Sequence, residues 1–306
     1  MTDLASQPVA PDSGSQRDRG ISARSRPIDA SFWKRAVRHR SFVAGGVLSL
    51  LVIGAALLSL VWTPWPAYEL DMANKLVSPS LSHWLGTDML GRDNASLLLV
   101  GARSSMLVGG VAVGIGVLFG VSLGLWAAAQ KGWIEECVMR LGDFTFAFPA
   151  ILSAIMLAAV AGPGMMTSIV AIGIFKIPVF LRITRGSANA VLAREFVLAA
   201  RASGKGNFRI AIEHVLPNIL SVLIVQATIQ FALAILAEAA LSYLGLGIQP
   251  PQPSWGRMLN DAQSLLFLAP SLAVYPGLAI ASAVLGLNLL GDGLRDLFDP
   301  RLARER

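Results

Sequence analysis

Charged residues are scarce in this sequence. Asp, Glu, Lys and Arg together make up 14% of the 306 residues, whereas apolar residues make up 54%. A soluble domain of this length carries about a quarter charged residues. A bilayer core about 30 Å thick needs roughly 20 apolar residues per helix, and six stretches qualify: Ser41–Thr63, Ser104–Ala129, Phe144–Ala161, Gly164–Leu181, Ile219–Ala237 and Leu272–Gly291. The composition excludes a soluble fold and predicts an all-α polytopic membrane protein with six transmembrane helices.

The residues of common catalytic and metal sites are also sparse. The single Cys137 excludes an intramolecular disulfide. The three histidines are scattered, and no HExxH or CxxC motif occurs. We therefore predict no catalytic residue, no metal site and no cofactor bound by this chain, which argues against an intramembrane enzyme. An ion-coupled secondary transporter is a weaker alternative, because it needs carboxylates deep in the membrane. None of the six spans contains one, and Glu238 stands just beyond the outer end of the fifth.

The distribution of basic residues predicts the orientation. With the N-terminus inside, 20 of the 25 Lys and Arg residues fall in cytoplasmic segments and 4 in external ones. Short cytoplasmic segments of membrane proteins carry this excess. Both termini are therefore predicted to be cytoplasmic, and the net charge of +6 reflects topology rather than nucleic-acid binding.

The pattern divides the chain into five segments. We expect a disordered cytoplasmic tail over residues 1–30, an interfacial helix and the first span over 31–63, and an extracytoplasmic loop over 64–103. A five-helix core over 104–291 contains a cytoplasmic loop at 182–217, and a cytoplasmic tail covers 292–306. Within the external loop, Asp93 is expected to cap a helix that runs to about Arg103.

Glycines spaced by four predict close helix packing in the second span. Gly110 and Gly114 form one such pair, and Gly116, Gly120 and Gly124 form a longer run. Pro149 and Pro178 are expected to lie inside the third and fourth spans, where neighbouring helices satisfy the freed carbonyl groups.

The loop at 182–217 contains the polar stretch "EFVLAARASGKGNFRIAIEHVLPN" from Glu195 to Asn218. Its Gly-Lys pair is not a phosphate-binding P-loop, since that motif needs a Gly where Ala199 stands and a Ser or Thr where Gly206 stands. Helix-forming residues predict a helix from about Ser187 to Ser203 that ends at Gly204.

One narrow face of that helix joins Phe196, Ala199, Ala200 and Ser203. Such a face suits a groove on a soluble partner, although a solvated loop helix explains the periodicity equally well. A second short helix should then lead to Pro217, in the first turn of the next span.

The same stretch resembles the cytoplasmic loop of ABC-importer permeases, whose pattern is Glu-Ala-Ala, three residues, Gly, nine residues, Ile-x-Leu-Pro. The matching residues are Ala199, Ala200, Gly204, Leu216 and Pro217, while Leu198 stands in place of Glu and His214 in place of Ile. Three further stretches resemble the peptide-importing branch: Leu85–Gly109, Glu238–Leu259 and Tyr275–Arg301. Together they identify the chain as similar to the C-type permease subunits of dipeptide, oligopeptide and nickel ABC importers.

The resemblance implies a type I ABC importer permease fold in the bacterial inner membrane, in contact with lipid. It implies pairing with a paralogous B-type permease, two ATP-binding subunits that use ATP and Mg, and an extracytoplasmic substrate-binding protein. It implies import of di- or oligopeptides, or alternatively of nickel or another small solute. The implied coupling residues are Glu195, Phe196, Leu198, Ala199, Ala200, Arg201, Gly204, Leu216 and Pro217.

Four polar residues inside spans are candidates for lining a pathway: Lys176, Gln226, Gln230 and Asn288. Gln226 and Gln230 are one helical turn apart, and amides in this position also bond neighbouring helices. Lys176 is expected to extend toward the inner interface instead of lining the pathway.

Overall fold

The computed structural model describes residues 35–298 as a bundle of long helices, without a β-strand in that range. The long helices are α2 (Arg40–Leu58), α3 (Asn94–Gln130), α4 (Gly132–Ala147), α5 (Ala150–Ala161), α6 (Met165–Leu192), α9 (Leu216–Tyr243) and α11 (Ser271–Phe298). Shorter elements are η1 (Met72–Asn74), α7 (Glu195–Ala202), α8 (Asn207–Ile210), η2 (Ala211–Val215), α10 (Trp255–Ala262) and η3 (Gln263–Leu265). The predicted tail 1–30, the start of the predicted interfacial helix and residues 299–306 lie outside the described residues.

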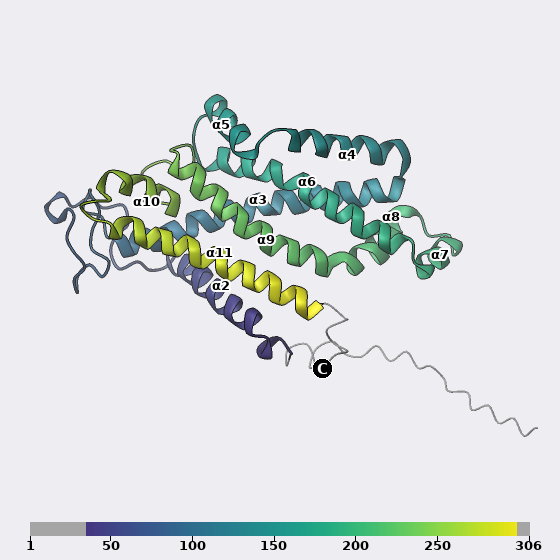
Figure 1. The fold of residues 1–306 in the computed structure, drawn as a ribbon, viewed down its shortest axis with the longest axis horizontal. Coiled ribbons are helices and arrows are strands. Elements are labelled where there is room, and N and C mark those ends of the chain that lie inside the picture. The colour runs from purple at the N-terminus through teal and green to yellow at the C-terminus, as the bar shows by residue number, and fades with distance from the viewer. Residues whose placement is uncertain (1–34, 299–306) are drawn as a thin grey trace, which may run out of the picture.

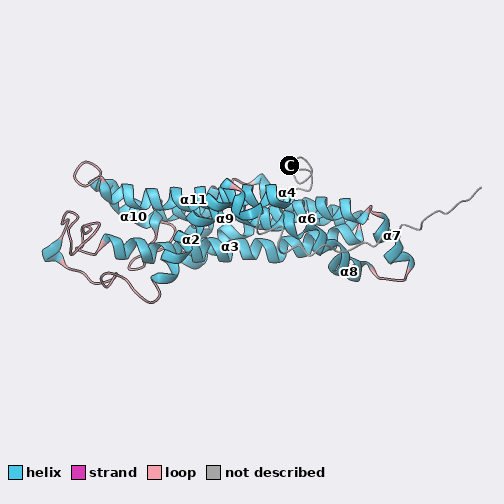
Figure 2. Cartoon of the chain, turned by 90° about the horizontal axis from the view of Figure 1, so that it is seen from below, coloured by secondary structure: helices cyan, strands magenta, loops and turns pink. Residues whose placement is uncertain are grey.

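The bundle is elongated, with short helices and loops at its two ends (Figures 1 and 2). Helices α2 and α11 run side by side along one flank, and α4 and α5 lie beyond α6 on the other. Helices α7 and α8 form one tip, which we call the α7 end. Helix α10 and the loop between α2 and α3 form the opposite tip, the α10 end.

The prediction of several membrane-spanning helices is confirmed, but the second and third predicted spans differ from the helices observed. Five helices are long and apolar enough to cross a membrane, or six if the bent pair α4 and α5 forms one span. The predicted spans at Ser41–Thr63, Gly164–Leu181, Ile219–Ala237 and Leu272–Gly291 correspond to α2, α6, α9 and α11. The fold is therefore all-α and polytopic.

The predicted third span, Phe144–Ala161, is not one helix. It breaks between α4 and α5, whose axes differ by 82°. Phe148 has an extended backbone and Pro149 caps α5, instead of lying inside a helix as predicted. The reason is local: a proline disfavours helical backbone at the preceding residue and lacks the N–H of a helical hydrogen bond. Pro178, in contrast, does lie inside α6.

Helix α3 begins earlier than the predicted second span. Asp93 caps it as predicted, since its side chain accepts a hydrogen bond from the Ser96 N–H. The helix then continues without a break at Arg103 as far as Gln130. At 1.5 Å per residue, its 37 residues extend about 55 Å, so α3 is longer than the bilayer core is thick.

The most extensive helix contact joins α3 to α6 through the predicted glycine run. A Cβ atom added at Gly116 would lie 2.4 Å from Cβ of Lys176, and one at Gly120 would lie 2.5 Å from the Ile177 carbonyl oxygen. One at Gly124 would lie 2.7 Å from Cβ of Thr184. The other predicted pair makes no such contact, because Gly114 faces open space and Gly110 meets only Phe231, at 3.9 Å.

A buried carboxylate joins three segments near the α10 end. Glu238 of α9 is fully buried and accepts hydrogen bonds from Ser105 Oγ of α3 at 2.7 Å and from Ser242 Oγ at 2.6 Å. Ser242 Oγ in turn accepts from the Ile248 N–H. The indole N–H of Trp255, in α10, donates to the Leu98 carbonyl of α3. These bonds fix α10 and its connecting loop against α3 and α9.

The α3–α6 contact gives a direct stability prediction. Gly120→Ala should lower the free energy of unfolding by about 1–3 kcal/mol, because the added methyl overpacks a backbone contact. Gly114→Ala adds the same methyl to the same helix in open space, so it should be neutral or slightly stabilising. Thermal unfolding of both variants in detergent measures the difference, and equal melting temperatures would contradict the packing assignment.

Candidate functional site

The α7 end carries the segment that resembles a coupling loop, and its helix is separate from α6. The predicted single helix from Ser187 to Ser203 is wrong, because α6 ends at Leu192 and α7 begins at Glu195. Arg194 has an extended backbone that turns the chain between the two helices. No Pro or Gly stands at the break, so the sequence offered no signal for it.

Helix α7 packs one side against the rest of the chain and exposes the other. Val197 is fully buried and Ala200 is 8% exposed, and both belong to the main apolar core. Leu198 is 55% exposed and Ala199 is exposed beside it. The face predicted to receive a partner therefore needs revision, because Ala200 points inward.

The exposed surface of α7 is a ridge that we define as Glu195, Leu198, Ala199 and Ala202. These residues follow the i, i+3, i+4, i+7 spacing of one helix face. Phe196 and Arg201 are exposed on either side of it, and the Phe196 ring lies edge-on to His214 at 6.2 Å. Because two of its four side chains are alanines, the ridge can approach the surface of a partner's groove closely.

Helix α7 ends just before Gly204, as predicted. Gly204 has φ +84°, a left-handed conformation that favours glycine. The Lys205 N–H donates to the Ala200 carbonyl. The ammonium of Lys205 lies 2.7 Å from Glu213 Oε2 and 3.1 Å from His214 Nε2, so the Gly-Lys pair serves the loop's own ion pair.

The second short helix leads to Pro217 as predicted, and it is continuous with the following span. Helix α8 passes through η2, a π-helical turn, directly into α9. The π turn ends at Val215, two residues before Pro217, which lies in the first turn of α9 as predicted. The wider turn accommodates the missing N–H of the proline. Leu216 is half-buried and Pro217 is exposed.

Two exposed apolar residues at this end escaped the sequence prediction. Phe208 is 79% exposed and Ile212 is 46% exposed. Their i, i+4 spacing is a signal for a shared helix face. Both lie in the segment that follows α7 in the chain.

Two of the four candidate pathway residues form a pair. The ammonium of Lys176 donates a hydrogen bond of 2.9 Å to Oε1 of Gln230, which joins α6 to α9. The predicted extension of Lys176 toward the inner interface is therefore not observed. Gln226 and Asn288 are half-buried, and neither forms a side-chain hydrogen bond within residues 35–298. Asn288 is on α11 and is not part of the pair.

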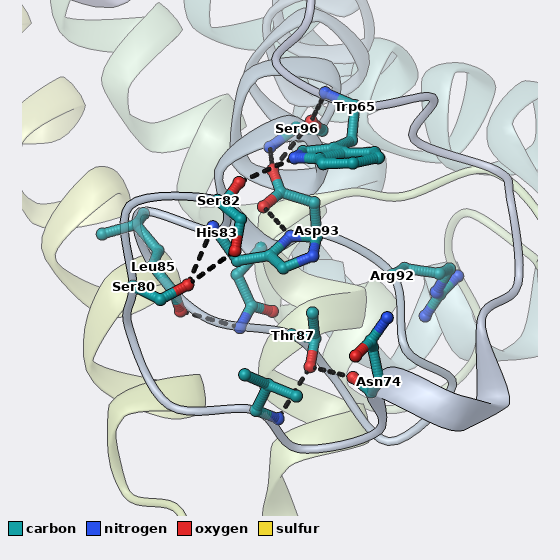
Figure 3. Close-up of polar contacts among 12 residues, drawn as sticks. Trp65, Asn74, Ser80, Ser82, His83, Leu85, Thr87, Arg92, Asp93 and Ser96 are labelled. Atoms are coloured by element: carbon teal, nitrogen blue, oxygen red, sulfur yellow. Dashed lines mark hydrogen bonds and ion pairs between the residues drawn. The ribbon is translucent and has the colours of Figure 1, made fainter.

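The α10 end is held by a network around Asp93 (Figure 3). His83 Nδ1 lies 3.0 Å from Asp93 Oδ1, and the Trp65 ring stacks on His83 at 4.9 Å. Asp93 Oδ2 accepts from both the N–H and the hydroxyl of Ser96, and that hydroxyl accepts from the Trp65 N–H. The network fastens the α2–α3 loop over the start of α3.

Ion pairs link the same loop to α10. Arg92 lies 2.7 Å from Asp88 and 3.8 Å from Asp261, and Arg257 lies 3.0 Å from Asp261. Burial raises the pKa of Asp261 above its usual range, although Arg257 and Arg92 both lower it. Arg92 and Asp261 line a pocket with Met89 and Met258. The predicted capping role of Asp93 agrees with this geometry.

Within the described residues no group of three or more His, Cys, Asp or Glu side chains could hold a metal ion. Five or six helices long and apolar enough to cross a membrane, packed as one elongated bundle, define a class of protein: a multi-pass α-helical membrane protein.

Comparison with known proteins gives the family. Residues 120–304 match the family model described as "Binding-protein-dependent transport system inner membrane component". The chain belongs to this family and is therefore a transport component of the inner membrane, not an enzyme.

Individual relatives agree with this assignment. The chain is 42% identical, over 89% of its length and 90% of the relative's, to a glutathione transport system permease protein of Pectobacterium atrosepticum. It is 40% identical, over 88% of its length and 90% of the relative's, to a dipeptide transport system permease protein of Alkalihalophilus pseudofirmus. A solved inward-facing MetNI methionine ABC transporter shares the fold, with TM-score 0.55, 17% identity, and 66% of this chain and 97% of that one covered.

The network around Asp93 gives a second stability prediction. Asp93→Ala removes both the cap of α3 and the partner of His83, so it should lower the free energy of unfolding by about 1–2 kcal/mol. Asp71→Ala, the matched control, removes the cap of the exposed turn η1 and should cost about 0.5 kcal/mol or less. Thermal unfolding in detergent compares them, and an Asp93→Ala shift no larger than the control's would refute the anchoring role.

Proposed function

We propose that this chain is the C-type permease subunit of an ATP-driven importer for di- or oligopeptides. The observation that carries the proposal is the α7 ridge, a small-residue helix face held at one tip of an inner-membrane transport fold. The named substrates of the two relatives, glutathione and dipeptides, support a peptide substrate. Nickel or another small solute is the alternative within the same branch.

The α7 ridge is proposed as the contact with an ATP-binding subunit. Val197 and Ala200 anchor α7 to the core, so a push on the ridge is passed to the membrane helices instead of being lost in a mobile loop. The exposed residues Phe196 and Arg201 flank the contact, and Gly204 ends it. Ala200 acts from beneath as a packing residue. Leu198, which replaces the carboxylate of the family pattern, makes an apolar contact.

The proposed assembly contains a paralogous B-type permease, two ATP-binding subunits that bind ATP and Mg, and an extracytoplasmic binding protein. The excess of basic residues in segments adjoining the α7 end supports a cytoplasmic location for that end and for both termini. The α10 end then faces outward. Closure of the ATP-binding subunits would move the helices between inward-facing and outward-facing arrangements around the pathway. The proposed core is 104–291, with the coupling loop at 182–217.

Reconstitution tests the function itself. The purified chain should hydrolyse no ATP, whereas the complete complex should hydrolyse ATP faster with peptide-loaded binding protein than with empty binding protein. Vesicles containing the complex should take up the same peptide. Stimulation by nickel-loaded binding protein alone would favour the alternative substrate, and absence of any stimulation by a loaded binding protein would refute the importer.

A substitution on the ridge tests the coupling surface. Ala199→Asp places a charge in the proposed groove without touching the core, so it should reduce peptide-stimulated ATP hydrolysis about tenfold or more while leaving membrane insertion intact. Ala73→Asp makes the same change at an exposed position of the α2–α3 loop and should leave hydrolysis unchanged. Ala200→Asp is less informative, since it buries a charge under α7. Wild-type hydrolysis and uptake in Ala199→Asp would remove the ridge from the interface.

A further inference from the structure

The pair Lys176–Gln230 is an isolated charged site deep in the bundle. Gln230 stands at the middle of α9, about 20 Å from either helix end at 1.5 Å per residue. Lys176 stands about 16 Å from the start of α6 at Met165. A charged side chain this far inside a membrane protein is costly and marks a functional site by default.

The charge of Lys176 has no counter-ion in the described part of the chain. Its only side-chain partner among residues 35–298 is the neutral amide oxygen of Gln230. Two other cations of α6 are paired with carboxylates: Arg182 with Asp143, and Arg185 with Glu135. An ammonium group has three N–H donors, so Lys176 keeps two donors for another acceptor.

The backbone contact beneath Lys176 fixes where its side chain starts. A Cβ atom at Gly116 would lie 2.4 Å from Cβ of Lys176, so the stem lies against α3. The side chain remains half-buried instead of enclosed. Gln226, one turn along α9 from Gln230, is also half-buried and has no side-chain bond within the described residues. Its amide adds a second unused set of polar groups about 6 Å along the helix axis.

We propose that Lys176 binds the carboxylate of the transported peptide within the pathway, with Gln230 holding the ammonium in place and Gln226 offering a further amide contact. The proposal rests on the peptide-importer function proposed above and adds the substrate's chemistry at this point. An ammonium–carboxylate hydrogen bond is stronger than a neutral one, and a peptide always carries a carboxylate unless its C-terminus is blocked. The site would therefore favour peptides with an additional acidic side chain over those with a basic one.

Transport by the complete complex tests this preference. Binding protein is preloaded separately with an acidic or a basic dipeptide, Ala-Glu or Ala-Lys, and supplied at saturating concentration so that capture does not limit uptake. Lys176→Met should lower the ratio of Ala-Glu to Ala-Lys uptake about tenfold, and Lys176→Arg should preserve it. Arg182→Met removes a cation from the same helix that already has a carboxylate partner, and should leave the ratio unchanged. An unchanged ratio in Lys176→Met would overturn the proposal.

A labelling measurement covers the case in which Lys176→Met blocks all transport. Cys137→Ser removes the single cysteine, and Lys176→Cys then introduces a unique thiol. A membrane-impermeant methanethiosulfonate carrying a sulfonate should label that thiol in the assembled complex, and loaded binding protein should slow labelling during ATP turnover. Reaction with a membrane-permeant maleimide alone would place Lys176 in lipid or packed protein and overturn the proposal. Absence of transport by the wild-type complex would instead count against the importer function. The labelling result would still show whether position 176 faces the pathway.

Discussion

The arrangement depends on the close contact between α3 and α6, which glycines alone permit. Gly116, Gly120 and Gly124 let α6 approach until side chains and backbone of one helix meet the backbone of the other. Without an aqueous hydrophobic effect between membrane helices, such packing is a main source of their association. The contact has two consequences for function. It sets the position of the Lys176 stem inside the bundle, and it holds α6 as the rigid support from which α7 projects.

Buried carboxylates near the α10 end supply the second set of constraints, because each accepts hydrogen bonds from another segment or lies beside a partner there. Glu238 is satisfied by Ser105 and Ser242, and Asp93 by Ser96 and His83. In a low-dielectric interior an unpaired polar group is expensive, so these bonds specify one arrangement of the α10 end. Lys176 differs from these carboxylates, because the only side-chain partner of its ammonium in the described residues is a neutral amide. That difference is the basis for assigning it a ligand.

The sequence predicted the features that follow from composition, local spacing and the family pattern. Apolar length gave the membrane class, Asp93 gave a helix start, and the glycine run gave a tight contact. It failed where the answer depends on packing between distant segments. No Pro or Gly marks the break before α7 in the sequence. Ala200 is buried because it packs, with Val197, against the apolar core. The bend at Pro149 was hidden because an apolar run on both sides imitates a single span. The partner of Lys176 stands 54 residues away, beyond any local pattern.

The central claim is that the α7 ridge contacts an ATP-binding subunit and transmits its movement. The most direct measurement places a photocrosslinking amino acid at Leu198 in the fully assembled transporter and identifies the attached protein. The same probe at Leu81, which is 99% exposed in the α2–α3 loop, serves as the comparison. The account predicts attachment of the ATP-binding subunit from position 198 and not from position 81. Attachment of the ATP-binding subunit from position 81, or none from position 198 in an active complex, would contradict it.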